Sequence, residues 1–195
     1  NKLMKNTGPF AFSRITGVPF NTSLSFALSA SWIDVNNDGN LDLFISYLSG
    51  SKLYLGNGSG GFTEKTGDPL VTDLFESFSS PLWADFDNDG DQDVFILDDN
   101  GLNKIYRNDG SGNFTNANIA AFASDNLEYF SGAWGDYDND GDLDLFVTNS
   151  GDGGTSGPNL LYQNNGNGTF TKMLSLPNSP TENKTTASLG CSWLD

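Results

Sequence analysis

Residues 83–96 read WADFDNDGDQDVFI, a stretch in which five aspartates occupy alternate positions. They are Asp85, Asp87, Asp89, Asp91 and Asp93. Two unit charges about 4 Å apart repel each other by roughly 4 kcal/mol at an effective dielectric constant of 20, so this crowding is unfavourable unless something offsets it. The stretch therefore predicts either an extended, solvated segment or a turn that closes around a cation.

The same stretch recurs along the chain at a nearly constant period. It returns as SWIDVNNDGNLDLFI at 31–45 and as AWGDYDNDGDLDLFV at 133–147. Each tryptophan of the chain stands two residues before an aspartate, and those aspartates are 51, 51 and 59 residues apart. The tryptophans are Trp32, Trp83, Trp134 and Trp193. The longer last interval contains a GDGGTSG insertion at 151–157 and a slightly longer link to the next repeat.

A second repeated pattern keeps register with the first. It reads SKLYLGNGSGGFT at 51–63, NKIYRNDGSGNFT at 103–115 and NLLYQNNGNGTFT at 159–171, and the N-terminal residues 1–13 are a degraded copy with Met4 in place of the tyrosine. The Gly/Asn-rich centres suit hairpin turns, which need positive φ angles. Each repeat therefore predicts four short strands, with the acidic loop between the first two.

Four-stranded units with a period near 50 residues are typical of β-propeller blades. We expect an all-β fold of antiparallel four-stranded blades, with about four repeats present as a partial propeller or as a segment of a larger one. A stacked solenoid is the alternative, although solenoid repeats are usually shorter. The expected divisions are the end of one blade and a linker at 1–26, repeats at 27–77, 78–128 and 129–186, and the first strand of a fourth repeat at 187–195.

The acidic loops align residue by residue when position 1 is the first aspartate. Positions 1, 3, 5, 7 and 9 are Asp34, Asn36, Asp38, Asn40 and Asp42 in the first loop; Asp85, Asp87, Asp89, Asp91 and Asp93 in the second; and Asp136, Asp138, Asp140, Asp142 and Asp144 in the third. Position 6 is always glycine, which permits a sharp turn. Hard oxygen ligands in this number suit Ca²⁺ better than Mg²⁺. We therefore expect about three Ca²⁺ sites, with position 7 contributing its backbone carbonyl.

The loop begins like an EF-hand loop but does not continue like one. An EF-hand loop has a glutamate at position 12 and a helix after it, whereas here position 12 is Ile45, Ile96 or Val147 within an expected strand. A merely solvated acidic turn is the alternative for any single loop, but three loops with the same spacing argue against it. More than half of the 25 acidic residues lie in these loops, so the net charge of −16 does not indicate a uniformly acidic halophilic surface.

The pattern D-x-D-x-D-G-x-x-D between strands, followed by Y-x-N-x-G-x-G-x-F-T, resembles the FG-GAP/VCBS repeats of integrin-α-like β-propellers. The resemblance covers almost the whole chain. It implies a seven-bladed propeller with calcium between the first two strands of a blade, and an extracellular or cell-surface location. Seven blades would need roughly 350 residues, so the 195 residues are expected to leave open ends that the rest of a parent chain or neighbouring copies complete.

Composition narrows the function classes. The chain has no histidine, which excludes Ser-His-Asp and Cys-His catalysis. Its acidity disfavours binding to nucleic acid, which needs Lys and Arg, and no apolar stretch approaches the roughly 20 residues that would insert into a membrane. Cys191 is expected to be a buried small apolar residue. The chain begins at Asn1 without a signal-peptide pattern, so we expect a mature or excised segment.

These observations favour a non-enzymatic, calcium-stabilised module for adhesion, ligand binding or assembly. The alternative is a carbohydrate-binding, lectin-type propeller, although recurring Trp and Tyr positions favour core packing over sugar stacking. An enzyme with paired carboxylates is a third hypothesis, and it is disfavoured because the four glutamates are scattered. Five glycosylation sequons occur, at Asn21, Asn57, Asn113, Asn167 and Asn183. The first and last are the better candidates, because N-G-[ST] also marks a hairpin turn.

Overall fold

The computed structural model describes residues 2–21, 26–48, 50–73, 80–98, 103–123, 129–149, 158–173 and 191–192. These residues form three four-stranded antiparallel sheets and one two-stranded sheet, which confirms the predicted all-β fold of propeller blades. The insertion at 151–157, Asn183, Trp193 and most of 187–195 lie outside the described residues. Within the described ranges, the helices are all too short to span a membrane.

Each four-stranded sheet is one blade, with its strands in sequence order. Blade 1 consists of β3 (Ala27–Ile33), β4 (Asp42–Tyr47), β5 (Gly50–Gly56) and β6 (Phe62–Lys65). Blade 2 consists of β7 (Ser80–Ala84), β8 (Asp93–Leu97), β9 (Lys104–Asn108) and β10 (Phe114–Asn116). Blade 3 consists of β11 (Tyr129–Gly135), β12 (Asp144–Asn149), β13 (Leu160–Asn164) and β14 (Phe170–Met173). The N-terminal hairpin pairs β1 (Leu3–Gly8) with β2 (Ala11–Ile15).

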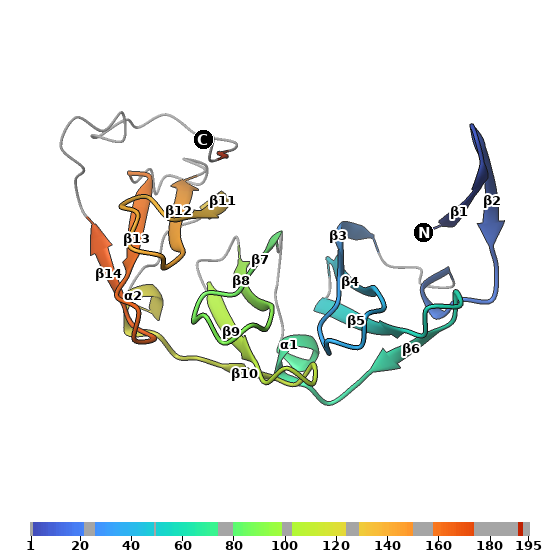
Figure 1. The fold of residues 1–195 in the computed structure, drawn as a ribbon, viewed down its shortest axis with the longest axis horizontal. Coiled ribbons are helices and arrows are strands. Elements are labelled where there is room, and N and C mark those ends of the chain that lie inside the picture. The colour runs from blue at the N-terminus through green and yellow to red at the C-terminus, as the bar shows by residue number, and fades with distance from the viewer. Residues whose placement is uncertain are drawn as a thin grey trace.

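The blades fan out along an open arc (Figure 1). The first strands, β3, β7 and β11, lie on the concave side, and the last strands, β6, β10 and β14, lie on the convex side. The register repeats from blade to blade. Trp32, Trp83 and Trp134 face Leu43, Val94 and Leu145 on the second strand, and these in turn face Tyr54, Tyr106 and Tyr162 on the third.

The hydrophobic cores lie between blades rather than within them. Phe44 of β4 packs into a cluster with Val94 and Ile96 of β8. Leu43 and Ile45, on the other face of β4, pack instead with residues near the N-terminal hairpin. Successive side chains of a strand point to opposite faces, so each central strand contributes to two cores. This explains why β4 and β8 are buried along their whole length although their sheets are antiparallel.

Three short helices were not predicted: η1 (Pro19–Asn21), α1 (Pro69–Thr72) and α2 (Ala120–Ala123). They are too short to show a helical period. In α1 the reason for the turn is local, because Asp68 caps the helix by accepting a hydrogen bond from the Leu70 N–H at 3.0 Å. The other Asp68 oxygen accepts from the Phe114 N–H at 3.0 Å, so the capping residue also joins blade 1 to blade 2.

The aromatic residues mostly pack as predicted, with one exception. The three strand tyrosines are almost fully buried. Trp83 packs edge-on against Phe44 and Phe114, and Trp134 packs against Phe86 and Phe170. Trp32 is 48% exposed, so the expectation of core packing is wrong for this residue.

Among the described residues, the Trp32 indole makes a single ring contact, with Phe62, so much of its surface is left uncovered. A cleft of about 410 Å³ lies beside the indole, between blade 1 and the N-terminal segment that supplies Leu3, Met4 and Phe20 to its lining. Cys191 also differs from its prediction, because it is only partly buried. Burial raises the pKa of its thiol, although a hydrogen bond with the Ser131 side chain acts in the opposite direction.

Candidate metal centre

The three acidic loops connect the first and second strands of their blades, and position 1 closes each of them. In the second loop, the two oxygens of Asp85 accept hydrogen bonds from the backbone N–H groups of Asp89 and Gly90, at 3.1 and 3.0 Å. Asp34 and Asp136 make the same pair of hydrogen bonds in their own loops. Position 1 therefore curls the chain back on itself, as the alternating carboxylates predicted.

Two positions in each loop have positive φ angles. The glycine at position 6 has φ values of 81°, 94° and 96° in the three loops, which confirms the reason given for its presence. The asparagine at position 4 was not singled out in the sequence, yet Asn37, Asn88 and Asn139 have φ values of 54°, 59° and 62°. Asparagine tolerates this region better than other non-glycine residues, and that preference is the signal that could have found them.

The aspartate at position 9 joins the loop to the third strand of the blade through hydrogen bonds. Asp93 accepts from the Phe86 N–H with one oxygen and from the Asn108 N–H on β9 with the other, at 3.3 and 2.7 Å. Asp42 and Asp144 make equivalent pairs. All three side chains are buried. Burial raises the pKa of Asp93 to about 7, partly opposed by these hydrogen bonds, and it also raises the pKa values of Asp42 and Asp144.

Carboxylates converge in two of the three loops. Oxygens of Asp85, Asp87 and Asp89 lie within 4.8 Å of one another, as do oxygens of Asp136, Asp138 and Asp144. The first loop, which the structure describes in full, has Asn36 at position 3 and forms no such acidic trio. Two of the predicted groups are thus acidic clusters, while the first loop would depend on an amide oxygen at position 3.

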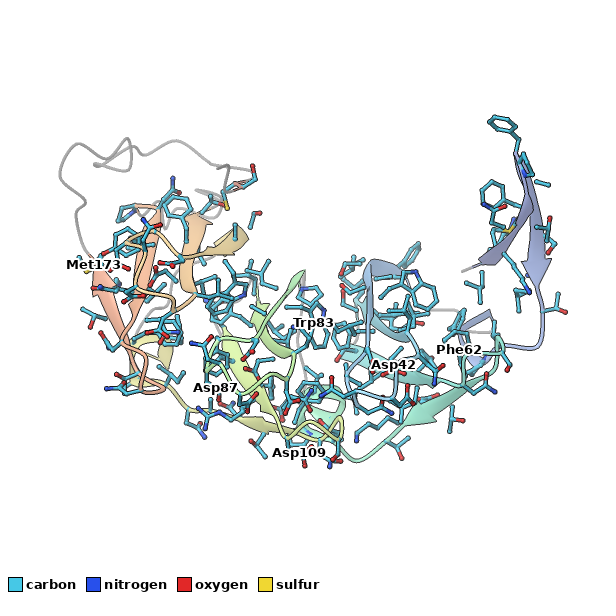
Figure 2. The ribbon with its side chains drawn as sticks, viewed as in Figure 1. Asp42, Phe62, Trp83, Asp87, Asp109 and Met173 are labelled. Carbon is cyan, nitrogen blue, oxygen red and sulfur yellow. The ribbon has the colours of Figure 1, made fainter. Side chains whose placement is uncertain are left out.

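One oxygen in the second loop is suited to a cation. Asp87 Oδ1 is buried and has no hydrogen-bond partner, whereas Oδ2 of the same side chain contacts the guanidinium of Arg107 at 2.5 Å. An unsatisfied buried carboxylate oxygen is unfavourable, and a hard divalent cation would satisfy it. Figure 2 shows Asp87 among side chains of blade 2. The all-oxygen donor set and the converging carboxylates therefore fit Ca²⁺.

The side chain at position 7 has a role that sequence reasoning missed. Asp91 Oδ1 accepts a hydrogen bond of 2.5 Å from the Asn37 amide, and Asp142 Oδ1 accepts one of 2.7 Å from the Asn88 amide. Both bonds join the loop of one blade to the loop of the next. Position 7 was expected to act through its backbone carbonyl alone, but its side chain connects neighbouring blades.

A comparison with solved structures supports the propeller fold. The chain is similar to the structure of a lectin from Agrocybe aegerita, with a TM-score of 0.58 and 18% identity. That structure is described as showing how the lectin specifically recognises non-reducing terminal N-acetylglucosamine. The alignment covers 87% of this chain and 45% of the lectin chain, so this chain spans about half the length of that structure. At this identity the likeness concerns the fold alone. No curated protein matches.

The family assignment comes from the repeats themselves. The sequence model described as FG-GAP-like repeat matches residues 34–96, 85–147 and 136–195. Each match begins at position 1 of an acidic loop, and the first two end at position 12 of the next loop. Because the three matches together span most of the sequence, the chain belongs to the family of FG-GAP-like repeat proteins.

Proposed function

We propose that this protein is a calcium-binding, non-enzymatic β-propeller module of an extracellular or cell-surface protein, serving adhesion, ligand binding or assembly. Ca²⁺ would be held by positions 1, 3, 5 and 9 and by the backbone carbonyl at position 7 of each loop. Its role would be structural, because neutralising the crowded carboxylates fixes the turn between the first two strands. The observation that carries the proposal is the buried, unsatisfied Asp87 Oδ1 within the Asp85, Asp87 and Asp89 cluster.

Calcium-dependent stability tests this proposal. A ligand that binds only the native state stabilises it by RT ln(1 + [L]/Kd), about 2.7 kcal/mol at a hundredfold excess over Kd. The melting temperature should therefore be higher in millimolar Ca²⁺ than after removal of metal by chelation and dialysis, and Mg²⁺ should have a smaller effect. Titration calorimetry should give about three sites. If the melting temperature is the same in both conditions and no heat of binding is detected, the loops are not calcium sites.

Carbohydrate binding is a second candidate function, favoured by the exposure of Trp32. The indole borders a cleft of about 360 Å³ that Asn40, Asn57 and Phe62 also line. An exposed aromatic ring beside amide groups offers both stacking and hydrogen bonding to a sugar. A glycan array, followed by titration of the Trp32→Ala variant, would test this. A sugar that binds at this cleft should lose affinity in that variant.

Glycosylation remains a prediction. Asn57, Asn113 and Asn167 are exposed, but Asn57 Oδ1 accepts two backbone hydrogen bonds in its turn, from Ser59 and Gly61. These hydrogen bonds support the interpretation that the N-G-S sequence at Asn57 serves a hairpin turn. Intact mass before and after glycosidase treatment of the protein from a eukaryotic host tests all five sequons.

A further inference from the structure

The three acidic loops differ at one residue of the neighbouring strand. The residue after the buried tyrosine of the third strand is Leu55 in blade 1, Arg107 in blade 2 and Gln163 in blade 3. In blades 2 and 3 this side chain contacts position 3 of the loop. Arg107 pairs with Asp87, and the Gln163 amide donates a hydrogen bond of 2.7 Å to Asp138 Oδ2. In blade 1 the corresponding residues are an apolar Leu55 and an uncharged Asn36, so the first loop has neither a carboxylate at position 3 nor a polar partner for it on the strand.

Arg107 is held against the second loop by two contacts. Its Nε lies 2.5 Å from Asp87 Oδ2, and its guanidinium carbon lies 5.8 Å from the centre of the Phe86 ring. The Asp87 side chain is 13% exposed, whereas that of Arg107 is 44% exposed. The arginine therefore pairs with one carboxylate oxygen, while the buried Oδ1 has no hydrogen-bond partner.

We infer that Arg107 is a built-in counter-ion that makes the second loop less dependent on calcium than the third. This inference rests on the proposed calcium function. A fixed positive charge offsets part of the repulsion among the five aspartates in the absence of calcium, and it opposes the approach of a divalent cation. Gln163 holds Asp138 in the same manner but brings no charge. The third loop therefore has the highest calcium affinity, the second is weaker, and the first, with three carboxylates, is the weakest.

Reciprocal exchange of the two residues tests the inference. In a background in which Asp38→Ala and Asp140→Ala disable the first and third loops, R107Q should raise calcium affinity on the order of tenfold. R107K retains the positive charge, so its calcium affinity should stay close to that of the parent. In the complementary background, in which Asp38→Ala and Asp89→Ala leave only the third loop, Q163R should lower the affinity by a similar factor. Titration calorimetry gives each value.

Thermal unfolding of the otherwise unchanged chain supplies a second readout that does not depend on those backgrounds. Without metal, R107Q should melt below the parent, because the five aspartates lose their counter-ion. In saturating calcium the two proteins should melt at nearly the same temperature. The role of Arg107 would be overturned if R107Q bound calcium no more tightly than the parent. It would also be overturned if R107Q melted below the parent by the same amount with and without calcium. If the unmutated chain binds no calcium, the proposed function itself fails, which is a different result.

Discussion

The side-chain amide of Asn37 donates a hydrogen bond of 2.5 Å to Asp91 Oδ1, so the acidic loop of blade 1 is joined directly to that of blade 2. Asn88 repeats the arrangement with Asp142 one blade later. In both cases position 4, with its positive φ angle, reaches position 7 of the next loop. Folding of one loop therefore bears on the geometry of its neighbour.

The link should be measurable as a coupling energy. Asn37→Gly removes the amide but tolerates the positive φ angle, so it is a better probe than Asn37→Ala. In a double-mutant cycle with Asp91→Ala, the coupling in the free energy of unfolding should be about 1 kcal/mol. Asn139→Gly is the matched control, since within the described residues no acceptor lies opposite Asn139. Coupling close to zero would mean that the two loops are independent.

Substitutions within one loop should have graded effects on calcium. Asp89→Ala removes a proposed ligand from the Asp85, Asp87 and Asp89 cluster and should abolish one binding event in calorimetry. Asp91→Asn retains an acceptor for Asn37 and leaves the backbone carbonyl in place, so it should keep that event with at most a modest loss of affinity. Equal loss in both variants would show that the Asp91 side chain is itself a ligand.

The calcium-free protein should become more stable as the pH falls from 7 towards 5. Burial raises the pKa values of Asp93, Asp42 and Asp144 above those of the unfolded chain, to about 7 for Asp93. Over this range the native state therefore binds more protons than the unfolded state, and its stability is lost as the pH rises through the folded pKa. Groups with a lowered pKa, such as Asp38 and Asp73, act oppositely but only at lower pH.

Melting temperatures from pH 5 to 8 in metal-free buffer measure this dependence. Asp93→Asn serves as the control and should flatten the profile, because it removes the carboxyl group whose pKa is raised most. With calcium present the trend should reverse, since protons and the cation compete for the same carboxylates. A calcium-free protein that grows steadily more stable from pH 5 to 8 would contradict the prediction.

Buried amides at the end of the third strand should contribute to the joining of blades. Asn108 donates to the backbone carbonyls of Val35 and Gln92, at 2.8 and 3.1 Å, and so connects blade 2 to the loop of blade 1. Asn164 does the same one blade later. Asn108→Ala leaves buried carbonyls unsatisfied and should cost about 1–3 kcal/mol of unfolding free energy in urea titrations.

Asn113, which is exposed, supplies the comparison for this measurement. Asn113→Ala should reduce the free energy of unfolding clearly less than Asn108→Ala does. The corresponding residue of blade 1 is Gly56, where an added Cβ would lie 2.2 Å from the Leu41 carbonyl oxygen. Blade 1 therefore lacks the amide altogether. If Asn113→Ala destabilises the protein as much as Asn108→Ala does, the buried amide has no special role.

Within a blade, the sequence was a reliable guide because its information is local. The Trp and Tyr positions predicted strands that pair in the same register in all three blades, and the position-6 glycine predicted the sharp turn. Contacts between blades could not be predicted from the sequence. Asn37 and Asp91 are 54 residues apart, and no spacing rule within one repeat indicates that they meet. The exposure of Trp32 and the pairing of Arg107 with Asp87 likewise depend on how blades and strands dock.

The placement of the cores between blades has a consequence for synthesis on the ribosome. A newly completed blade covers one face of its predecessor, while its own second face stays bare until the next repeat has emerged. At about 5–20 residues per second, a repeat of 51 residues takes roughly 3–10 s to appear. Throughout that interval the alternate side chains of the central strand, such as Phe95 and Leu97 of β8, have no partner layer. Each blade therefore passes once through an aggregation-prone interval during translation, until the next blade covers its second face.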